Sequence, residues 1–180
     1  MSVAAHFQTL ARYNAWANAK IYASVASLQE EDIARPRHAF FGSILGTLNH
    51  LLVGDIMWLN RLGEPASGEK KPAGLDDVLY EDFPELRRRR TAMDSHIIGV
   101  VDGMDPERIN TGSIQYETLS LPGVKLETPV SLVLTHLFNH GTHHRGQVHD
   151  QLSQTTVAPP PLDLVFFLRD TPERNTAIGA

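Results

Sequence analysis

The stretch that decides the fold is TPVSLVLTHLFNHGTHHRGQVHDQL, residues 128–152. Thr128 followed by Pro129 is typical of the N-cap and the first position of a helix. The positions that recur at a spacing of three or four, as one face of an α-helix does, are Val133, Leu137, His140, His144 and Val148. We therefore predict a helix up to about residue 152 whose inward face carries two imidazoles where aliphatic side chains are expected.

Three other segments repeat apolar residues with the same helical period. They cover residues 3–28, 43–62 and 82–103. The second begins at Ser43, a plausible N-cap, and is followed by Gly63, a plausible C-cap. Because it is apolar on most of its circumference, we expect it to be well buried. Residues 30–36 end the first helix and open a loop.

A change of period separates the third and fourth helices. Residues 114–118 and 124–128 alternate apolar and polar side chains, and Pro122-Gly123 lies between them. This pattern predicts a small irregular hairpin with its turn at Pro122-Gly123. Residues 162–169 are apolar enough for a short helix that docks on the bundle, and the last ten residues are polar. The prediction is one all-α four-helix bundle over residues 1–170, with a hairpin, a short C-terminal helix and a polar tail over residues 171–180.

Composition excludes several classes of function. The 180 residues carry a net charge of −5 and contain no cysteine, which excludes disulfides, a thiolate nucleophile and any site that needs cysteine ligands. A negative chain without a basic stripe is not expected to bind nucleic acid or an anionic membrane. The N-terminus lacks the pattern of a signal peptide, and residues 51–59 are too short for a membrane span. We expect a cytoplasmic protein.

The two histidines of the fourth helix are a candidate metal site. At a spacing of four residues, His140 and His144 have Cβ atoms about 5–6 Å apart, so both rings can reach one ion. This spacing alone is equally consistent with exposed histidines or with core histidines bonded to backbone. A third ligand strengthens the case, because His50 lies mid-helix with Gly46 and Gly54 on its face. A helical glycine costs roughly 1 kcal/mol relative to alanine, so the pair indicates a need for space or close helix packing.

Three neutral imidazoles leave an ion with open coordination positions, as in catalytic rather than structural sites. Such an ion can acidify a bound water or bind a thiolate or enolate oxygen of a substrate. Nitrogen ligands suit zinc, nickel, copper or iron without choosing among them. Candidates for a group that orients a ligand or contacts substrate are His136, Asp55 and Arg145. A buried ion pair is the competing interpretation for Asp55, and helix packing is that for Arg145.

The chain resembles the DinB/YfiT-like superfamily of helical bundle proteins in four blocks. The clearest is NHGTHHRGQ at residues 139–147, which matches the histidine signature of that family. The others are YNAWAN at residues 13–18, LNHLL at residues 48–52 with Trp58-Leu59, and DLVFFLR at residues 163–169. The blocks come in the order of the family and span nearly the whole chain.

This resemblance implies an up-down-down-up bundle that forms a homodimer. It also implies a divalent metal held by the residues that match His50, His140 and His144; nickel or zinc is expected ahead of iron. Characterised members include thiol-dependent S-transferases and a maleylpyruvate isomerase, which use bacillithiol, mycothiol or glutathione. The leading hypothesis is therefore a metal-dependent enzyme of stress or detoxification chemistry that activates a thiol cosubstrate or a water against a small-molecule substrate. The alternatives are a non-catalytic metal-binding or ligand-sensing bundle, and a structural bundle whose histidines are vestigial.

Overall fold

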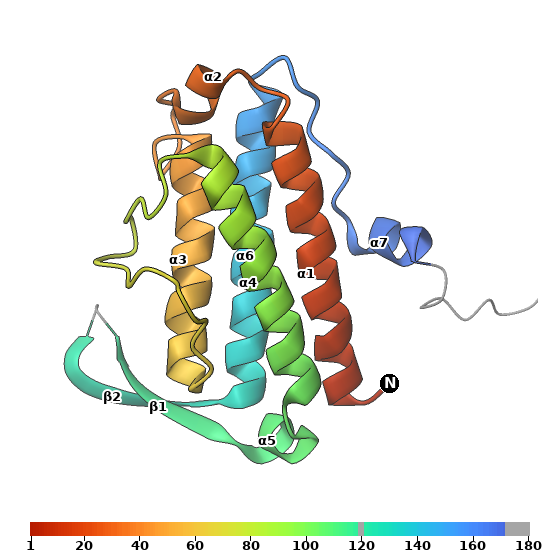
Figure 1. Cartoon of the computed structure of the whole chain (residues 1–180). Helices are drawn as coiled ribbons and strands as arrows, with labels where there is room; N and C mark the ends of the chain where they lie inside the picture. Colours follow the sequence, from red (N-terminus) through yellow and green to blue (C-terminus); the bar gives the residue numbers. More distant parts are fainter. Residues whose placement is uncertain (119–120, 172–180) are drawn as a thin grey trace, which may run out of the picture.

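Four long helices lie side by side in a computed structural model that describes residues 1–118 and 121–171 (Figure 1). They are α1 (Val3–Val25), α3 (Ile44–Leu62), α4 (Phe83–Gly103) and α6 (Val130–Ser153). Helices α1 and α6 run in one direction and α3 and α4 in the other. The predicted helical bundle with up-down-down-up topology is therefore confirmed. None of the described helices is both long and apolar enough to cross a membrane.

Helix boundaries follow from capping side chains. The Ser43 hydroxyl accepts a hydrogen bond of 3.0 Å from the backbone N–H of Gly46 at the start of α3. At the end of that helix, Gly63 has a φ of 77°, the left-handed conformation that glycine adopts without steric cost. The Asp82 carboxylate caps α4 by accepting a 2.8 Å hydrogen bond from the N–H of Glu85. The predicted bounds of α3 and α4 are accurate because these caps are visible in the sequence.

Three short helices complete the helical part of the described chain: α2 (Glu30–Ala34), α5 (Pro106–Thr111) and α7 (Leu164–Asp170). The apolar stretch at residues 162–169 correctly predicted α7. Sequence periodicity missed α2 and α5, because a helix of five or six residues covers fewer than two turns. The N-cap of α5 is Asp105, whose carboxylate accepts a 2.9 Å hydrogen bond from the N–H of Glu107.

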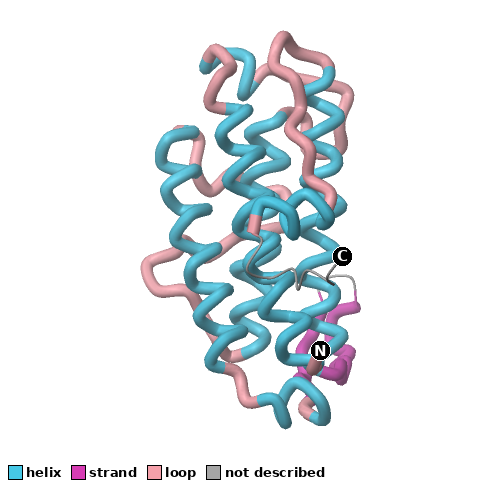
Figure 2. The backbone as a smooth tube through the Cα atoms, turned by 90° about the vertical axis from the view of Figure 1, so that its right-hand side faces the viewer, coloured by secondary structure: helices cyan, strands magenta, loops and turns pink. Residues whose placement is uncertain are grey.

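The hairpin pairs β1 (Ser113–Thr118) with β2 (Leu121–Pro129) in antiparallel register (Figure 2). The sequence pattern predicted the turn at Pro122-Gly123, but both residues lie within β2 rather than between the strands. Gly123 has a φ of 78° in that strand, and the register shifts between Glu117 and Thr118. The residues that the sequence pattern indicated as the turn therefore belong to an irregular part of the strand pairing, which contains a glycine with positive φ.

The start of α6 also differs from the prediction. Thr128 pairs with Ile114 across the hairpin, so Pro129 is the N-cap and the helix begins at Val130. The N–H of Val130 donates a 2.9 Å hydrogen bond to the carbonyl of Gly112. Strand β2 therefore extends to Pro129, and the strand pairing and this backbone hydrogen bond take the place of a side-chain cap at the start of α6. Of the predicted polar tail, residues 172–180 lie outside the described residues.

The core lies between two helix pairs. α1 packs beside α4 and α6, and α3 packs beside α6 and α4, so the α3–α6 seam is opposite the α1–α4 seam. The fully buried side chains at the centre include Ile21, Leu48, Leu52, Leu86, Leu134 and Leu152. The predicted inward face of α6, including His144, is on the α3 side.

Candidate metal centre

Three imidazoles converge where α3 faces α6. The Nε2 atom of His50 is 3.0 Å from that of His140 and 3.2 Å from that of His144. All three ligand nitrogens lie within 4.8 Å of one another. His50 and His144 are buried, whereas His140 is partly exposed. The structure thus brings together the three residues that the sequence singled out, and this group could hold a metal ion.

Hydrogen bonds fix the tautomers of two of these rings. The Nδ1 atom of His50 is 2.6 Å from the carbonyl oxygen of Leu75, and the Nδ1 atom of His144 is 2.8 Å from Oε1 of Gln147. Both partners are acceptors, so each Nδ1 carries the proton and each Nε2 presents a lone pair. Two lone pairs that face each other at 3.2 Å repel unless a cation or a proton lies between them.

The donor set fits a transition metal. Two nitrogens bound to one tetrahedral zinc at about 2.0–2.1 Å are roughly 3.3 Å apart, close to the separations of 3.0 and 3.2 Å observed here. Hydrogen bonds from the distal ring nitrogen to a carbonyl and to an amide oxygen are the usual support for metal-binding histidines. The third ring is different, because the buried Nδ1 of His140 has no hydrogen-bond partner among the described residues.

Burial keeps these rings neutral. Loss of solvent, followed by the neighbouring imidazoles, lowers the pKa of His140 to about 3. Loss of solvent also lowers the pKa of His144 to about 4, although its bond to Gln147 acts in the opposite direction. The pKa of His50 is lowered for the same main reason. Neutral imidazole is the form that binds metal, so the site needs no deprotonation near neutral pH.

A glycine and an aromatic ring shape the site. A Cβ on Gly54 would lie 2.6 Å from Cε1 of His140, so only glycine leaves that ring its place. Gly46 has another role: a Cβ there would meet the carbonyl oxygen of Phe41. The ring of Phe41 stacks on His50 with centroids 3.8 Å apart. Of the two glycines that indicated a need for space, one therefore makes room for a ligand ring and the other for the loop that covers His50.

Comparison with known proteins agrees with the fold. A sequence profile described as the DinB family matches residues 1–176 of this chain. The chain belongs to the DinB family. It is 29% identical over 167 residues to Protein DinB of Bacillus subtilis strain 168, across 88% of this chain and 91% of that protein. The crystal structure of a DinB-like protein from Bacillus cereus ATCC 10987 matches with a TM-score of 0.60 at 17% identity, over 81% of this chain and 89% of that one.

Asp55 of this DinB-family chain lies in a buried ion pair, and its charge acts on the pKa of His50 against the effect of burial. Its carboxylate accepts a hydrogen bond of 2.5 Å from Nη1 of Arg90, and Nη2 of Arg90 is 2.9 Å from the Asp94 carboxylate. Among the described residues, no hydrogen bond joins Asp55 to a histidine. Burial raises the pKa of Asp94 to about 6 despite the attraction of Arg90.

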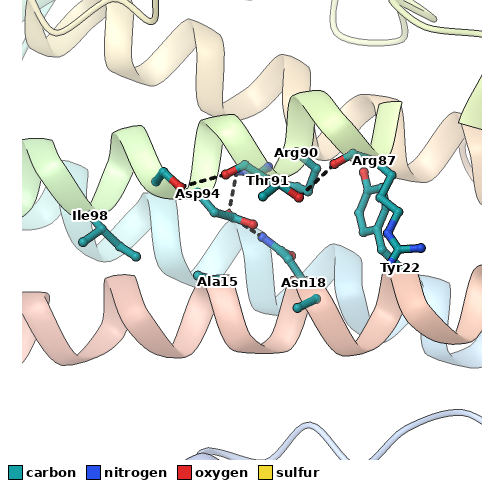
Figure 3. Close-up of a pocket in the computed structure, with 10 residues that line it drawn as sticks. Ala15, Asn18, Tyr22, Arg87, Arg90, Thr91, Asp94 and Ile98 are labelled. Atoms are coloured by element: carbon teal, nitrogen blue, oxygen red, sulfur yellow. Dashed lines mark hydrogen bonds and ion pairs between the residues drawn. The ribbon is translucent and has the colours of Figure 1, made fainter. Parts of the chain in front are cut away.

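Arg145 joins the same buried network from α6. Its guanidinium donates to the side-chain oxygens of Asn14 and Asn18, and both amides in turn donate to Asp94. Figure 3 shows the part of this network formed by Asn18, Arg90 and Asp94. Two arginines and two aspartates from three helices are thus connected through the amides of α1, so the buried charges balance. A cavity of about 180 Å³ adjoins this network between α1 and α4, on the side of the bundle opposite the histidines.

His136 extends the histidine row of α6 toward the hairpin. Its ring centroid is 5.7 Å from that of His140 and 4.6 Å from that of Trp58 on α3. Partial loss of solvent and then the charge of Arg61 lower its pKa. His136 therefore borders the three-histidine group as an exposed neighbour.

Two groups that support the site could not be read from the sequence. Leu75 contributes a backbone carbonyl from the connector between α3 and α4, and Phe41 contributes its ring from the loop before α3. Asn49 holds the connector in place: its amide donates to the carbonyl of Tyr80 at 3.0 Å and accepts from the N–H of Tyr80 at 2.9 Å. The adjacent Asn49-His50 pair, an amide beside a ligand candidate on a buried helix, was the one available signal.

Proposed function

We propose that this DinB-family chain is a metal-dependent enzyme that adds a small thiol, or water, to a small electrophilic substrate. The observation that carries the proposal is the convergence of His50, His140 and His144 through their ring nitrogens, of which those of His50 and His144 present lone pairs. Among the described residues, this metal-binding group includes no carboxylate or cysteine. Three protein ligands with open positions are the arrangement of catalytic zinc and related sites.

The chain itself contributes binding and orientation. When bound, a divalent metal such as nickel, zinc or iron supplies Lewis-acid activation of a thiol or of water. Leu75 and Gln147 hold the His50 and His144 rings in the tautomer that directs Nε2 inward. Phe41 covers His50, so a substrate would approach beside the partly exposed His140. Burial keeps all three rings from holding protons that would compete with a cation.

A non-catalytic role in metal binding or ligand sensing is the second candidate. It is favoured by one observation: among the described residues, no carboxylate or tyrosine hydroxyl forms a hydrogen bond with the three histidines. Proton transfer would therefore depend on the cosubstrate, on water or on the neighbouring His136.

Turnover with defined thiols separates the two candidates. Zinc-, nickel- and iron-loaded protein would be incubated with bacillithiol, mycothiol or glutathione and model electrophiles, and with ester substrates for hydrolysis. The His140→Ala variant provides the matched control, because it removes one ligand and leaves the other two supported. Metal-dependent turnover that this variant abolishes is the expected result. Stoichiometric metal binding without turnover in either assay would favour the sensing role.

A further inference from the structure

The α3–α6 seam continues beyond the three histidines as a ladder of facing side chains. His50 faces His144 with ring centroids 4.4 Å apart, and Gly54 faces the ring of His140. One turn further, Trp58 faces His136 at 4.6 Å. Each step is four residues along α3, so the row forms one stripe on the helix. The site is therefore one end of an extended strip rather than an isolated group.

Arg61 lies at the far end of this strip, where its guanidinium contacts two aromatic rings. Its guanidinium carbon lies 4.5 Å from the ring centroid of Trp58 and 4.7 Å from that of Tyr116, which comes from β1 of the hairpin. The two rings themselves meet edge to face, with centroids 5.3 Å apart. Stacking of a guanidinium on aromatic faces restricts the side chain while its edge N–H donors stay available.

Arg61 lacks a counter-ion among the residues that the structure describes, since no carboxylate lies within 4.0 Å of it. Partial burial lowers its pKa, which indicates a desolvated cation. Nearby Arg108 is different, because Glu64 pairs with it at 2.8 Å. The acidic residue nearest in sequence to Arg61 is thus already engaged, and the guanidinium of Arg61 can form a two-pronged pair with an incoming anion.

We infer that Arg61 binds a carboxylate of the small molecule whose reactive end lies at the three histidines. Residue 61 is seven positions after Gly54, the residue beneath His140, which places it about 10 Å further along the helix. The strip between them is formed by the rings of Trp58 and His136, which offer a surface for a short apolar or planar spacer. The ligand class is therefore a carboxylate-bearing thiol or electrophile with its two ends about 10 Å apart. Only the assignment of the reactive end rests on the proposed function.

The test compares carboxylates with matched alcohols. Protein loaded with cobalt(II) would be titrated with 3-mercaptopropionate, 8-mercaptooctanoate and 8-mercaptooctan-1-ol, and binding would be followed by the visible absorption of the metal. Wild type should bind 8-mercaptooctanoate about tenfold more tightly than the alcohol, the size of one partly exposed charge-assisted hydrogen-bond pair. The shorter acid, which cannot span the strip, should lose that advantage.

Three variants locate the effect. Arg61→Gln should remove the preference for the carboxylate without changing the affinity for the alcohol, and Arg61→Lys should retain part of it. Arg169→Gln is the control, because Arg169 also stacks on an aromatic ring, Phe166 at 4.4 Å, but on α7. Equal binding of acid and alcohol by wild type, or a preference that survives in Arg61→Gln, would overturn the inference and leave Arg61 as a clamp between α3 and the hairpin.

A second readout works without metal. In a Trp16→Phe background, Trp58 is the remaining tryptophan, and its fluorescence should respond to octanoate but not to octanol. If cobalt does not bind but octanoate does so through Arg61, the proposed function fails and the carboxylate subsite stands. If cobalt binds and octanoate does not, the subsite is wrong and the metal centre stands.

Discussion

Gly54 of α3 lies directly beneath the imidazole of His140 on α6: a Cβ at residue 54 would be only 2.6 Å from Cε1 of that ring. Glycine stabilises a helix less than a larger residue would. Its lack of a side chain at this position of α3 lets the histidine of α6 come close. The relationship connects the sequence to the site, because the three atoms nearest to such a Cβ all belong to the His140 ring.

The Gly54→Ala variant should weaken metal binding by at least tenfold. The added methyl group pushes the His140 ring out of line with His50 and His144, and small displacements of a ligand reduce affinity strongly. The affinity would be measured by competition with a chromophoric chelator. Gly99→Ala on α4 is the control, because nothing lies within 4 Å of a Cβ there, and it should leave metal affinity unchanged and stabilise its helix by up to about 1 kcal/mol. Equal metal affinities in the two variants would contradict the proposed role of Gly54.

Gln147 should act on the metal through His144. The Gln147→Leu variant removes the acceptor for Nδ1–H of His144, and loss of such a partner typically costs about 10–100-fold in metal affinity. Gln147→Glu keeps an acceptor at the same place and should restore most of the affinity. If Leu and Glu at this position behave alike, the bond does not orient the ring.

The Arg90 network should be essential for stability and not for the metal. Arg90→Met leaves Asp55 and Asp94 buried without their cation, which costs about 3–5 kcal/mol in the free energy of unfolding. Arg88→Met removes an exposed pair with Glu85 and should cost no more than about 1 kcal/mol. Urea unfolding of both variants gives the comparison, and similar losses of stability would rule out the buried network as the stronger contribution.

The metal-free protein should lose stability as the pH falls from about 6.5 toward 4. Folded His140 and His144 have pKa values of about 3 and about 4, against an ordinary value of 6.5. Between these limits the unfolded chain binds more protons than the folded one, so acid favours unfolding, with a slope of at most about 1.4 kcal/mol per pH unit for each histidine. Above about pH 6.5 both states are neutral and this contribution vanishes.

The control for this pH dependence is the double variant His140→Gln, His144→Gln. It lacks both of these imidazoles and keeps every carboxylate, so its free energy of unfolding should change less over the same range. Denaturant unfolding at a series of pH values, with chelator present, provides the measurement. Parallel pH profiles for wild type and the variant would show that these histidines do not titrate with depressed pKa values.

Local patterns in the sequence predicted the parts of the site that depend on one helix. The spacing of His140 and His144 is visible within a single turn, and His50 was found through its place on a buried helix and through Gly54. Gly46 supported the same prediction for the wrong reason, since it makes room for the carbonyl of Phe41. The caps Ser43, Gly63 and Asp82 similarly fixed helix bounds because their signal is local.

Contacts between distant segments could not be predicted in the same way. The Leu75 carbonyl that orients His50 is a backbone atom on a connector, so no side chain marks it. The hairpin turn was misplaced because Pro122-Gly123 is the usual signature of a turn, whereas here the glycine lies inside an irregular strand. Arg61 has no motif, and its importance follows only from the rings of Trp58 and Tyr116 that meet around it.

The most direct test of the three-histidine centre is the metal content of protein purified without a histidine tag. Inductively coupled plasma mass spectrometry should find one transition-metal ion per chain in wild type and none in the His140→Ala, His144→Ala double variant, with circular dichroism showing that both are helical. A wild-type protein that carries no stoichiometric metal, even after incubation with nickel, zinc or iron, or a double variant that retains it, would contradict the account.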